Sequence, residues 1–362
     1  MKLIRSLRAN LIVILFAWLF VGCVADPEAS EDDPLTGDFS HGVLILNEGL
    51  WRQDNSTVTY HNPTTGKTEN DYFGRRNPGL RIGDTGNDLV IWKERAFFVV
   101  STSRTIEVME LPSGKSAGRI RFPESAELRM MAIANDSLAW VTTYDDRVLE
   151  FNPTTLQPTN RSFPVGPAPE GIAWVNGRLF VANSSQGRLR ATEPKAWSVS
   201  VLNPATGIEE SALQCGPNPW ALHYLPATGR VYLLTRPLYP DSVGGLVEIN
   251  PTTLVEERRW TVINPGPMEV AFDDARGVAY LLAGGGVARL RLREHSDSVV
   301  MILPRSVFRG SPFDLGVSPS GKLYVADVQQ FTVSAEIVVA DTAGAIVTRF
   351  AGGVNPGAFG FY

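Results

Sequence analysis

The feature that most restricts the fold of this chain is a repeat of about 45 residues that begins near residue 41. Its first marker is a proline, two variable residues and an apolar residue at the start of a short apolar run. The marker occurs at residues 169–172, 219–222, 267–270, 312–315 and 356–359, with weaker versions that lack proline at 86–89 and 128–131. A period of 40–50 residues is typical of propeller blades or of a solenoid.

Two further markers recur within each repeat. Short runs rich in β-branched and aromatic residues follow turn residues, and the first of them is 43–46. Later runs of this kind cover residues 96–100, 138–141, 179–182, 231–234, 278–282 and 323–326. Asn-Pro turns follow at 62–66, 152–156, 203–207 and 250–254, where proline has the φ that a β-turn requires. No stretch of the body has a sustained helical period, so each repeat predicts several short strands.

These markers predict an all-β fold, a seven-bladed β-propeller of four-stranded antiparallel blades. The first repeat begins directly with its second strand at Val43, and the last residues, 357–362, form an inner strand with no partner of their own. The C-terminal strand is therefore expected to complete the N-terminal blade. A parallel β-solenoid is the competing architecture, but it leaves both terminal fragments unmatched.

The first forty residues have a different character from the body. Residues 1–22 combine a basic start with a twelve-residue apolar run, which is too short to span a bilayer and fits a secretory signal peptide. The run ends at Phe20-Val21-Gly22-Cys23, which resembles the lipobox of bacterial lipoproteins, so we expect lipidation of Cys23. Residues 23–40 are acidic and are expected to form a disordered tether, followed by the propeller at 41–362.

Charge and cysteine content exclude several classes of protein. The net charge is −5, but the first 22 residues hold three bases and residues 24–40 hold six acids, so the body carries about −2. Such a body lacks the basic surface that nucleic acid binding requires. With Cys23 assigned to lipidation, Cys215 has no partner for a disulfide, and we expect it to be a small buried residue.

One face of the propeller is expected to carry the binding site. Loops that enter the inner strands and loops between the second and third strands share this face, and they are rich in aromatic and charged residues. The opposite face carries the uniform Asn-Pro turns. A concave rim of this kind suits a large ligand with many hydrogen-bonding groups. The candidate ligand-binding residues are Trp51, Arg104, Arg129, Tyr144, Glu170, Arg188, Trp197, Trp220, Arg236, Tyr239, Asp314 and Phe331.

Packing is an alternative role for part of this set. Trp220 is equally expected to pack between blades or to bind ligand. Arg129, Glu170 and Asp314 are equally expected to form ion pairs between blades or to contact ligand. Trp140, Trp174 and Trp260 are expected to pack in the core.

Catalysis has little support in the sequence. The four histidines are scattered, and no nucleophile elbow or phosphate-binding loop is present. We therefore expect no catalytic residue, no cofactor and no metal. The remaining enzymatic hypothesis is a calcium-dependent, lactonase-like site built from Asn87, Glu170 and Asp314.

The repeats are similar to those of the YncE-like, YVTN-type propeller lipoproteins of Bacteroidetes and relatives. The residues that carry the resemblance are 42–49, 83–85, 169–173, 179–183 and 353–359. Within that group the chain resembles the BtuG-type surface lipoproteins, which cap a TonB-dependent outer-membrane transporter and bind cobalamin. The resemblance implies a lipid-anchored outer-membrane protein, exposed at the cell surface, that captures a corrinoid and passes it to a TonB-dependent receptor.

A second functional hypothesis remains open beside ligand capture. The same face of the propeller suits a protein–protein interaction scaffold of the cell envelope, which binds no small molecule. Uptake of a small ligand by the purified protein distinguishes the two.

Overall fold

Short runs of alternating or continuous apolar residues form strands throughout the body of the chain. The structure is a computed structural model and describes residues 40–238, 240, 243–263, 269–294 and 298–362. The predicted signal peptide, Cys23 and the predicted tether up to residue 39 lie outside the described residues. Within the described ranges, no helix has both the length and the apolar character needed to cross a membrane.

The strands form seven four-stranded antiparallel sheets, which confirms the predicted seven-bladed β-propeller. From the inside outward, blade 1 holds β28 (Pro356–Phe361), β1 (Val43–Asn47), β2 (Thr57–His61) and β3 (Thr68–Glu69). Blade 2 holds β4 (Gly86–Trp92), β5 (Arg95–Val100), β6 (Thr105–Glu110) and β7 (Ser116–Arg121). Blade 3 holds β8 (Leu128–Ile133), β9 (Ala139–Thr143), β10 (Arg147–Asn152) and β11 (Gln157–Pro164).

The remaining blades follow in chain order. Blade 4 holds β12 (Pro169–Val175), β13 (Arg178–Asn183), β14 (Ser198–Asn203) and β15 (Ile208–Gln214). Blade 5 holds β16 (Pro219–Leu225), β17 (Arg230–Thr235), β18 (Val243–Asn250) and β19 (Val255–Ile263). Blade 6 holds β20 (Val270–Asp273), β21 (Val278–Ala283), β22 (Gly286–Arg291) and β23 (Val300–Leu303). Blade 7 holds β24 (Ser311–Val317), β25 (Lys322–Val328), β26 (Ser334–Asp341) and β27 (Ile346–Val354).

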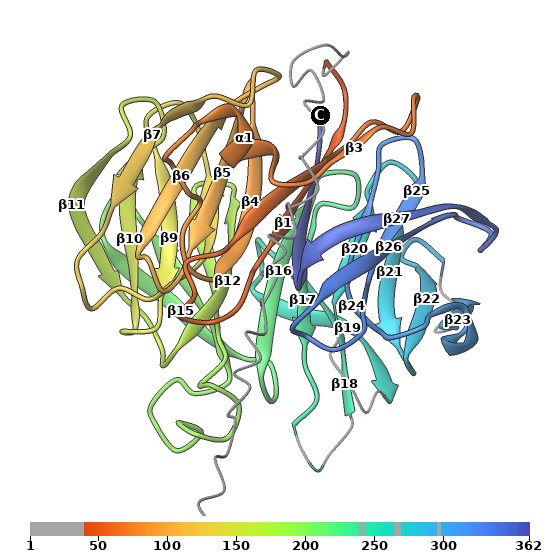
Figure 1. Cartoon of the computed structure of the whole chain (residues 1–362). Coiled ribbons are helices and arrows are strands. Elements are labelled where there is room, and N and C mark those ends of the chain that lie inside the picture. Colours follow the sequence, from red (N-terminus) through yellow and green to blue (C-terminus); the bar gives the residue numbers. More distant parts are fainter. Residues whose placement is uncertain (1–39, 239, 241–242, 264–268, 295–297) are drawn as a thin grey trace, which may run out of the picture. The chain divides into compact units, whose positions relative to one another are not determined.

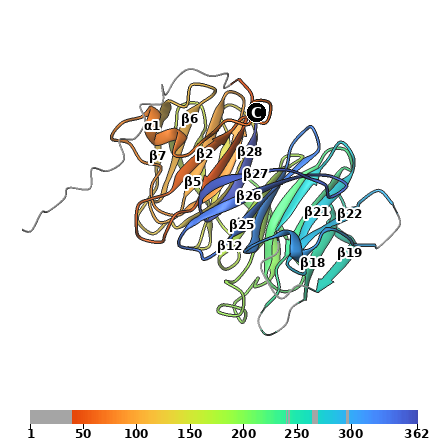
Figure 2. The ribbon, with the colours of Figure 1, turned by 45° about the vertical axis from the view of Figure 1, so that its right-hand side comes forward.

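The ring closes where the two ends of the body pair. Strand β28 is antiparallel to β1, with Val43 opposite Phe361 and Ile45 opposite Phe359. Gly42 and Tyr362 exchange two backbone hydrogen bonds of 3.0 and 3.1 Å at the end of this pairing. Strand β28 also contacts β4 and β24. Figure 1 shows the strands of the blades, and Figure 2 labels β28 near the C-terminus of the chain. The C-terminal strand therefore completes the N-terminal blade, as predicted.

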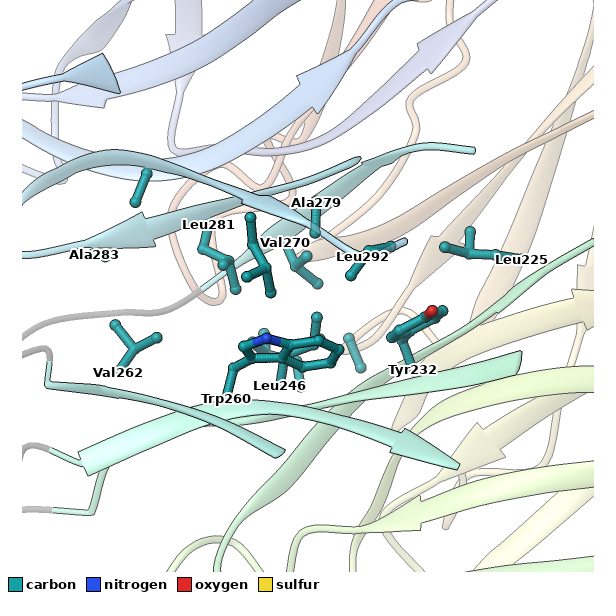
Figure 3. Close-up of a cluster of buried hydrophobic side chains, with 14 residues drawn as sticks. Leu225, Tyr232, Leu246, Trp260, Val262, Val270, Ala279, Leu281, Ala283 and Leu292 are labelled. Atoms are coloured by element: carbon teal, nitrogen blue, oxygen red, sulfur yellow. The ribbon is translucent and has the colours of Figure 1, made fainter. Parts of the chain in front are cut away.

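The core lies between neighbouring blades rather than in one central cluster. Each of the seven interfaces has its own group of buried apolar side chains. Between blades 5 and 6, Trp260 packs beside Leu246 and Tyr232 and faces Leu281 of the next blade (Figure 3). Trp140 is also buried, so the expectation of core packing is confirmed for Trp140 and Trp260. Trp174 is half-buried and stacks on Trp140 with ring centroids 5.0 Å apart.

Among the described residues, two short helices interrupt the strands. Helix α1 (Tyr72–Arg76) follows β3, and a single 3₁₀ turn, η1 (Arg305–Val307), precedes β24. Because α1 has only five residues, it is too short to produce a helical period in the sequence.

The Asn-Pro turns lie between the third and fourth strands of their blades, as expected. In the first of them, the Asn62 side-chain oxygen accepts hydrogen bonds from the backbone N–H groups of Thr64 and Thr65, at 2.9 and 3.0 Å. Asn152 and Asn250 accept the equivalent pairs of bonds in their own turns. These turns are held by local hydrogen bonds, which supports a structural role.

Candidate functional site

The inner strands of all blades begin at the same end of the ring, and polar side chains gather there. We call this group the mouth. It comprises Glu48, Asp88, Arg129, Tyr144, Glu170, Trp220, Arg236, Glu269 and Asp314, and every one of the seven blades contributes at least one member. Some members begin an inner strand, and others lie in a loop between a second and a third strand. Both kinds of loop share one face of a propeller, so repeat geometry brings together residues that are far apart in sequence.

The first part of the mouth is a buried ion pair between blades 3 and 4. Arg129 Nε donates to Glu170 Oε2 at 2.8 Å, and the Tyr144 hydroxyl donates to the other oxygen of Glu170. The Arg129 guanidinium also lies over the Tyr144 ring, 4.5 Å from its centroid. Glu170 is fully buried, and this network satisfies both of its carboxylate oxygens. A buried carboxylate without such partners would be strongly destabilising.

The second part is an aromatic and cationic stack on blade 5. The Arg236 guanidinium lies 3.5 Å from the ring centroid of the half-buried Trp220, and it forms an ion pair with Glu269 of blade 6. Arg129 approaches the same indole at 5.9 Å. Burial lowers the pKa of Arg236 to about 10, although Glu170 and Asp314 oppose this shift. The group remains a cation at neutral pH and polarises the indole face.

Three further carboxyl groups hold protons more tightly than usual. Burial raises the pKa of Glu48 to about 7, against the attraction of Arg129 and Arg236. Burial likewise raises the pKa of Asp88 to about 6 and holds the pKa of Asp314 well above its usual range. Near neutral pH the mouth therefore offers hydrogen-bond donors as well as acceptors.

A central cavity of about 530 Å³ continues inward from the mouth. It is lined by the inner strands of blades 2 to 6, with Asp88 among its polar residues. Beyond Asp88 the lining becomes mainly apolar and aromatic, with Met130, Trp174, Tyr224 and Phe272. Polarity thus falls from the mouth towards the middle of the ring.

Six of the twelve residues predicted from the sequence meet at the mouth. They are Arg129, Tyr144, Glu170, Trp220, Arg236 and Asp314. An ion pair between blades and a place at the binding face do not exclude each other. Arg129 and Glu170 form an interblade ion pair and also line the mouth.

The other predicted residues lie outside this group. Trp51 is 67% exposed with Arg52 over its ring, and Phe331 is 48% exposed. Arg188 is exposed and Arg104 is half-buried, both in loops between second and third strands. Tyr239 lies outside the described residues.

Trp197, another of the predicted ligand-binding residues, makes a contact within its own loop. It is half-buried, and its indole N–H donates to the Gly187 carbonyl at 2.9 Å. This bond ties together the two ends of the loop between β13 and β14. In this position Trp197 stabilises the loop.

Glu48 is a member of the mouth that sequence reasoning missed. It follows β1, in the loop that leads to β2, but it occupies the place where other blades use the first residues of an inner strand. In β28 the equivalent residue is Gly357, and a Cβ atom there would lie 2.6 Å from Glu48 Oε1. The sequence held one signal for this placement. Gly357 stands where blades 4 and 5 have Glu170 and Trp220, so it leaves space there for the side chain of another residue.

The residues of the calcium hypothesis have other partners within the protein. Both oxygens of Glu170 already accept hydrogen bonds, and the Asn87 amide donates to the Arg129 carbonyl at 2.6 Å. Within the described ranges, no three His, Cys, Asp or Glu side chains are grouped as metal ligands.

A family model matches the N-terminal part of the body. Residues 41–208 match a family model described as a domain of unknown function, DUF5074. No curated protein matches the chain.

Solved structures are similar at low identity. A quinonprotein alcohol dehydrogenase-like protein from Bacteroides thetaiotaomicron is 15% identical, with a TM-score of 0.68 over 90% of this chain and 79% of that one. A periplasmic gluconolactonase from Pseudomonas aeruginosa is 12% identical, with a TM-score of 0.64 over 89% of this chain and 98% of that one. A protein from Lactobacillus plantarum is 14% identical, with a TM-score of 0.65 over 89% of this chain and 99% of that one. At these identities the likeness establishes the fold alone, because propellers host unrelated functions.

Proposed function

We propose that this protein is a non-catalytic, lipid-anchored lipoprotein of the outer membrane that captures a small ligand at the mouth. A corrinoid such as cobalamin is the first candidate ligand, and a TonB-dependent outer-membrane receptor is the proposed partner that receives it. The observation that carries the proposal is the convergence of groups from all seven blades on one end of the channel.

The chemistry of the mouth favours a ligand rich in amide groups over a simple ion. Arg129 and Arg236 donate hydrogen bonds, ionised carboxylates accept them, and protonated Glu48 does both. The face of Trp220 adds an apolar plane. A corrinoid has a ring bordered by amide side chains, which are donors and acceptors at once, so it matches this mixed set.

The ion pairs within the mouth also favour binding over catalysis. Arg129, Tyr144 and Glu170 bind one another, and Arg236 is paired with Glu269. Side chains fixed in this way form a rigid, pre-organised surface, which reduces the entropy lost when a ligand binds.

Equilibrium dialysis of the purified full chain against cyanocobalamin, cobinamide and a ferric siderophore tests the proposal. We expect saturable binding of a corrinoid, and we expect Trp220→Ala and Glu170→Gln each to weaken it by about tenfold or more. The control is Asp136→Asn, which removes an exposed carboxylate from the opposite face. If none of the three compounds binds, the capture function is contradicted. If Asp136→Asn weakens binding as much as the other two variants do, the location of the site is contradicted.

A further inference from the structure

Four arginines line a second pocket in blade 6, at the opposite end of the blades from the mouth. The pocket has a volume of about 320 Å³, and its arginines are Arg276, Arg289, Arg291 and Arg293. Arg276 lies in the turn between β20 and β21, and Arg293 follows β22. Because consecutive strands of an antiparallel blade alternate in direction, these turns are on the face away from the inner-strand entrances. Thr342, in the turn between β26 and β27 of blade 7, closes the pocket.

Acidic side chains neutralise only part of this charge. Arg276 forms an ion pair with Asp273 and Arg291 forms one with Glu294, both at 2.6 Å. Within the part of the chain that the structure describes, Arg289 and Arg293 make no ion pair with a carboxylate. Their contacts are long hydrogen bonds to backbone carbonyls, from Arg289 to Thr342 at 3.4 Å and from Arg293 to Asp274 at 3.5 Å. Two guanidinium groups in the pocket thus keep most of their donors available.

The backbone makes room for these side chains. Gly277 has a φ of +63°, and a Cβ atom there would lie 2.8 Å from Arg293 Nε. Arg276 extends to the neighbouring blade, where a Cβ atom on Gly321 would lie 3.3 Å from its Nη1 atom. Arg293 therefore packs against a tight turn of blade 6, and Arg276 packs against one of blade 7.

An adjoining cavity extends the positive surface of the arginine pocket. It has a volume of about 250 Å³ and shares Arg289, Arg291 and Glu294 with the first pocket, with Ser298 and Val300 added. The body as a whole is slightly acidic, so this group of arginines is a local concentration of positive charge.

We propose that this pocket binds a phosphate-type dianion, in particular a phosphate monoester. Asp273 and Glu294 offset two of the four guanidinium charges, so Arg289 and Arg293 leave an excess of about two positive charges, which a dianion placed among them neutralises. The planar fork of arginine matches two phosphate oxygens at once, and arginine is preferred wherever such recognition occurs. The volume lies at the lower end of about 300–1,000 Å³ for small-molecule sites, which fits one phosphorylated group. Its source is either a soluble phosphate compound or a phosphorylated lipid headgroup.

The test uses the full chain and two probes that separate these sources. Binding of inorganic phosphate is measured by isothermal titration calorimetry. Binding to vesicles is measured by sedimentation, with phosphatidylcholine alone and with phosphatidic acid added. The lipid anchor contributes equally to both vesicle types, so the difference between them reports on the headgroup.

The variants are Arg289→Gln and Arg293→Gln, combined in one protein, with Arg121→Gln on the exposed outer strand of blade 2 as control. We expect the double variant to lose at least about tenfold in affinity for whichever probe binds, because each arginine supplies charge-assisted hydrogen bonds. The control should change affinity less than about twofold. Phosphate binding identifies a soluble ligand, and binding only to phosphatidic acid vesicles identifies a headgroup. Absence of both, or binding that the double variant leaves unchanged, overturns the proposal.

Discussion

At the scale of single residues, Glu48 couples the mouth to pH. Its pKa is raised by burial from 4.5 to about 7, so in the folded protein it keeps a proton that the unfolded chain releases. The folded state therefore binds more protons between these two values, and the free energy of unfolding falls as the pH rises through this window. Asp88 acts in the same direction below about pH 6.

Glu48→Gln tests this linkage because glutamine has the same shape and does not ionise. We expect the loss of unfolding free energy between pH 5 and pH 8 to become smaller by roughly 2–3 kcal/mol in the variant. Guanidinium unfolding at both pH values measures it. Glu124→Gln, at an exposed site, gives the background effect of removing one carboxylate. An identical pH dependence in wild type and Glu48→Gln would contradict the raised pKa.

Mouth residues were easiest to predict from the sequence where the repeat fixed their position. Glu170, Trp220 and Asp314 were found because they lie within the first four residues of inner strands, one or two positions after a recurring proline. Glu48 was missed because it reaches the mouth from the neighbouring strand, over Gly357. The contact of Trp197 with Gly187 could not be predicted, because a hydrogen bond inside a fourteen-residue loop, 184–197, leaves no periodic signal.

At the scale of elements, proline explains why the inner strands were easy to find. Pro169, Pro219 and Pro356 are the first residues of β12, β16 and β28. Proline has no N–H to donate and is tolerated at the first position of a strand, so it marks these starts. The helix α1 gave no such signal.

Strand β28 is the element on which ring closure depends. Deletion of residues 356–362 removes the partner of β1 and the contacts of β28 with β4 and β24. We expect a loss of more than about 4 kcal/mol in unfolding free energy, together with self-association through the exposed edge of β1. Thermal unfolding and size-exclusion chromatography measure the two effects.

Restoration of the missing strand provides the control for this deletion. A synthetic peptide of residues 356–362 should pair with β1 and recover the melting temperature, whereas a peptide of scrambled sequence should not. A truncated protein that melts like the wild type would show that β28 is not required for closure.

At the scale of the whole molecule, the number of blades could be read from the sequence but the ligand could not. Each repeat of about 45 residues forms one blade, so spacing alone gives the count. The mouth draws residues from seven repeats at non-equivalent positions, such as Arg236 in a loop and Asp314 in an inner strand. The repeat assigned both residues to one face, but no spacing rule gives their contacts with each other or the ligand that they would bind.

The proposed attachment of the whole molecule to a membrane depends on one of its two cysteines. We expect Cys23→Ser to abolish labelling by an alkyne analogue of palmitate and to move the protein from the membrane fraction to the soluble fraction, because acyl chains provide the anchor. Cys215→Ser is the matched control. Cys215 is 2% exposed between blades 4 and 5, and burial raises the pKa of its thiol to about 12, so it is a poor nucleophile. Label that persists in Cys23→Ser, or disappears in Cys215→Ser, would contradict lipidation at Cys23. The capture proposal would then need another means of holding the protein at the outer membrane, because proximity to the receptor raises the effective concentration of the ligand that is passed on.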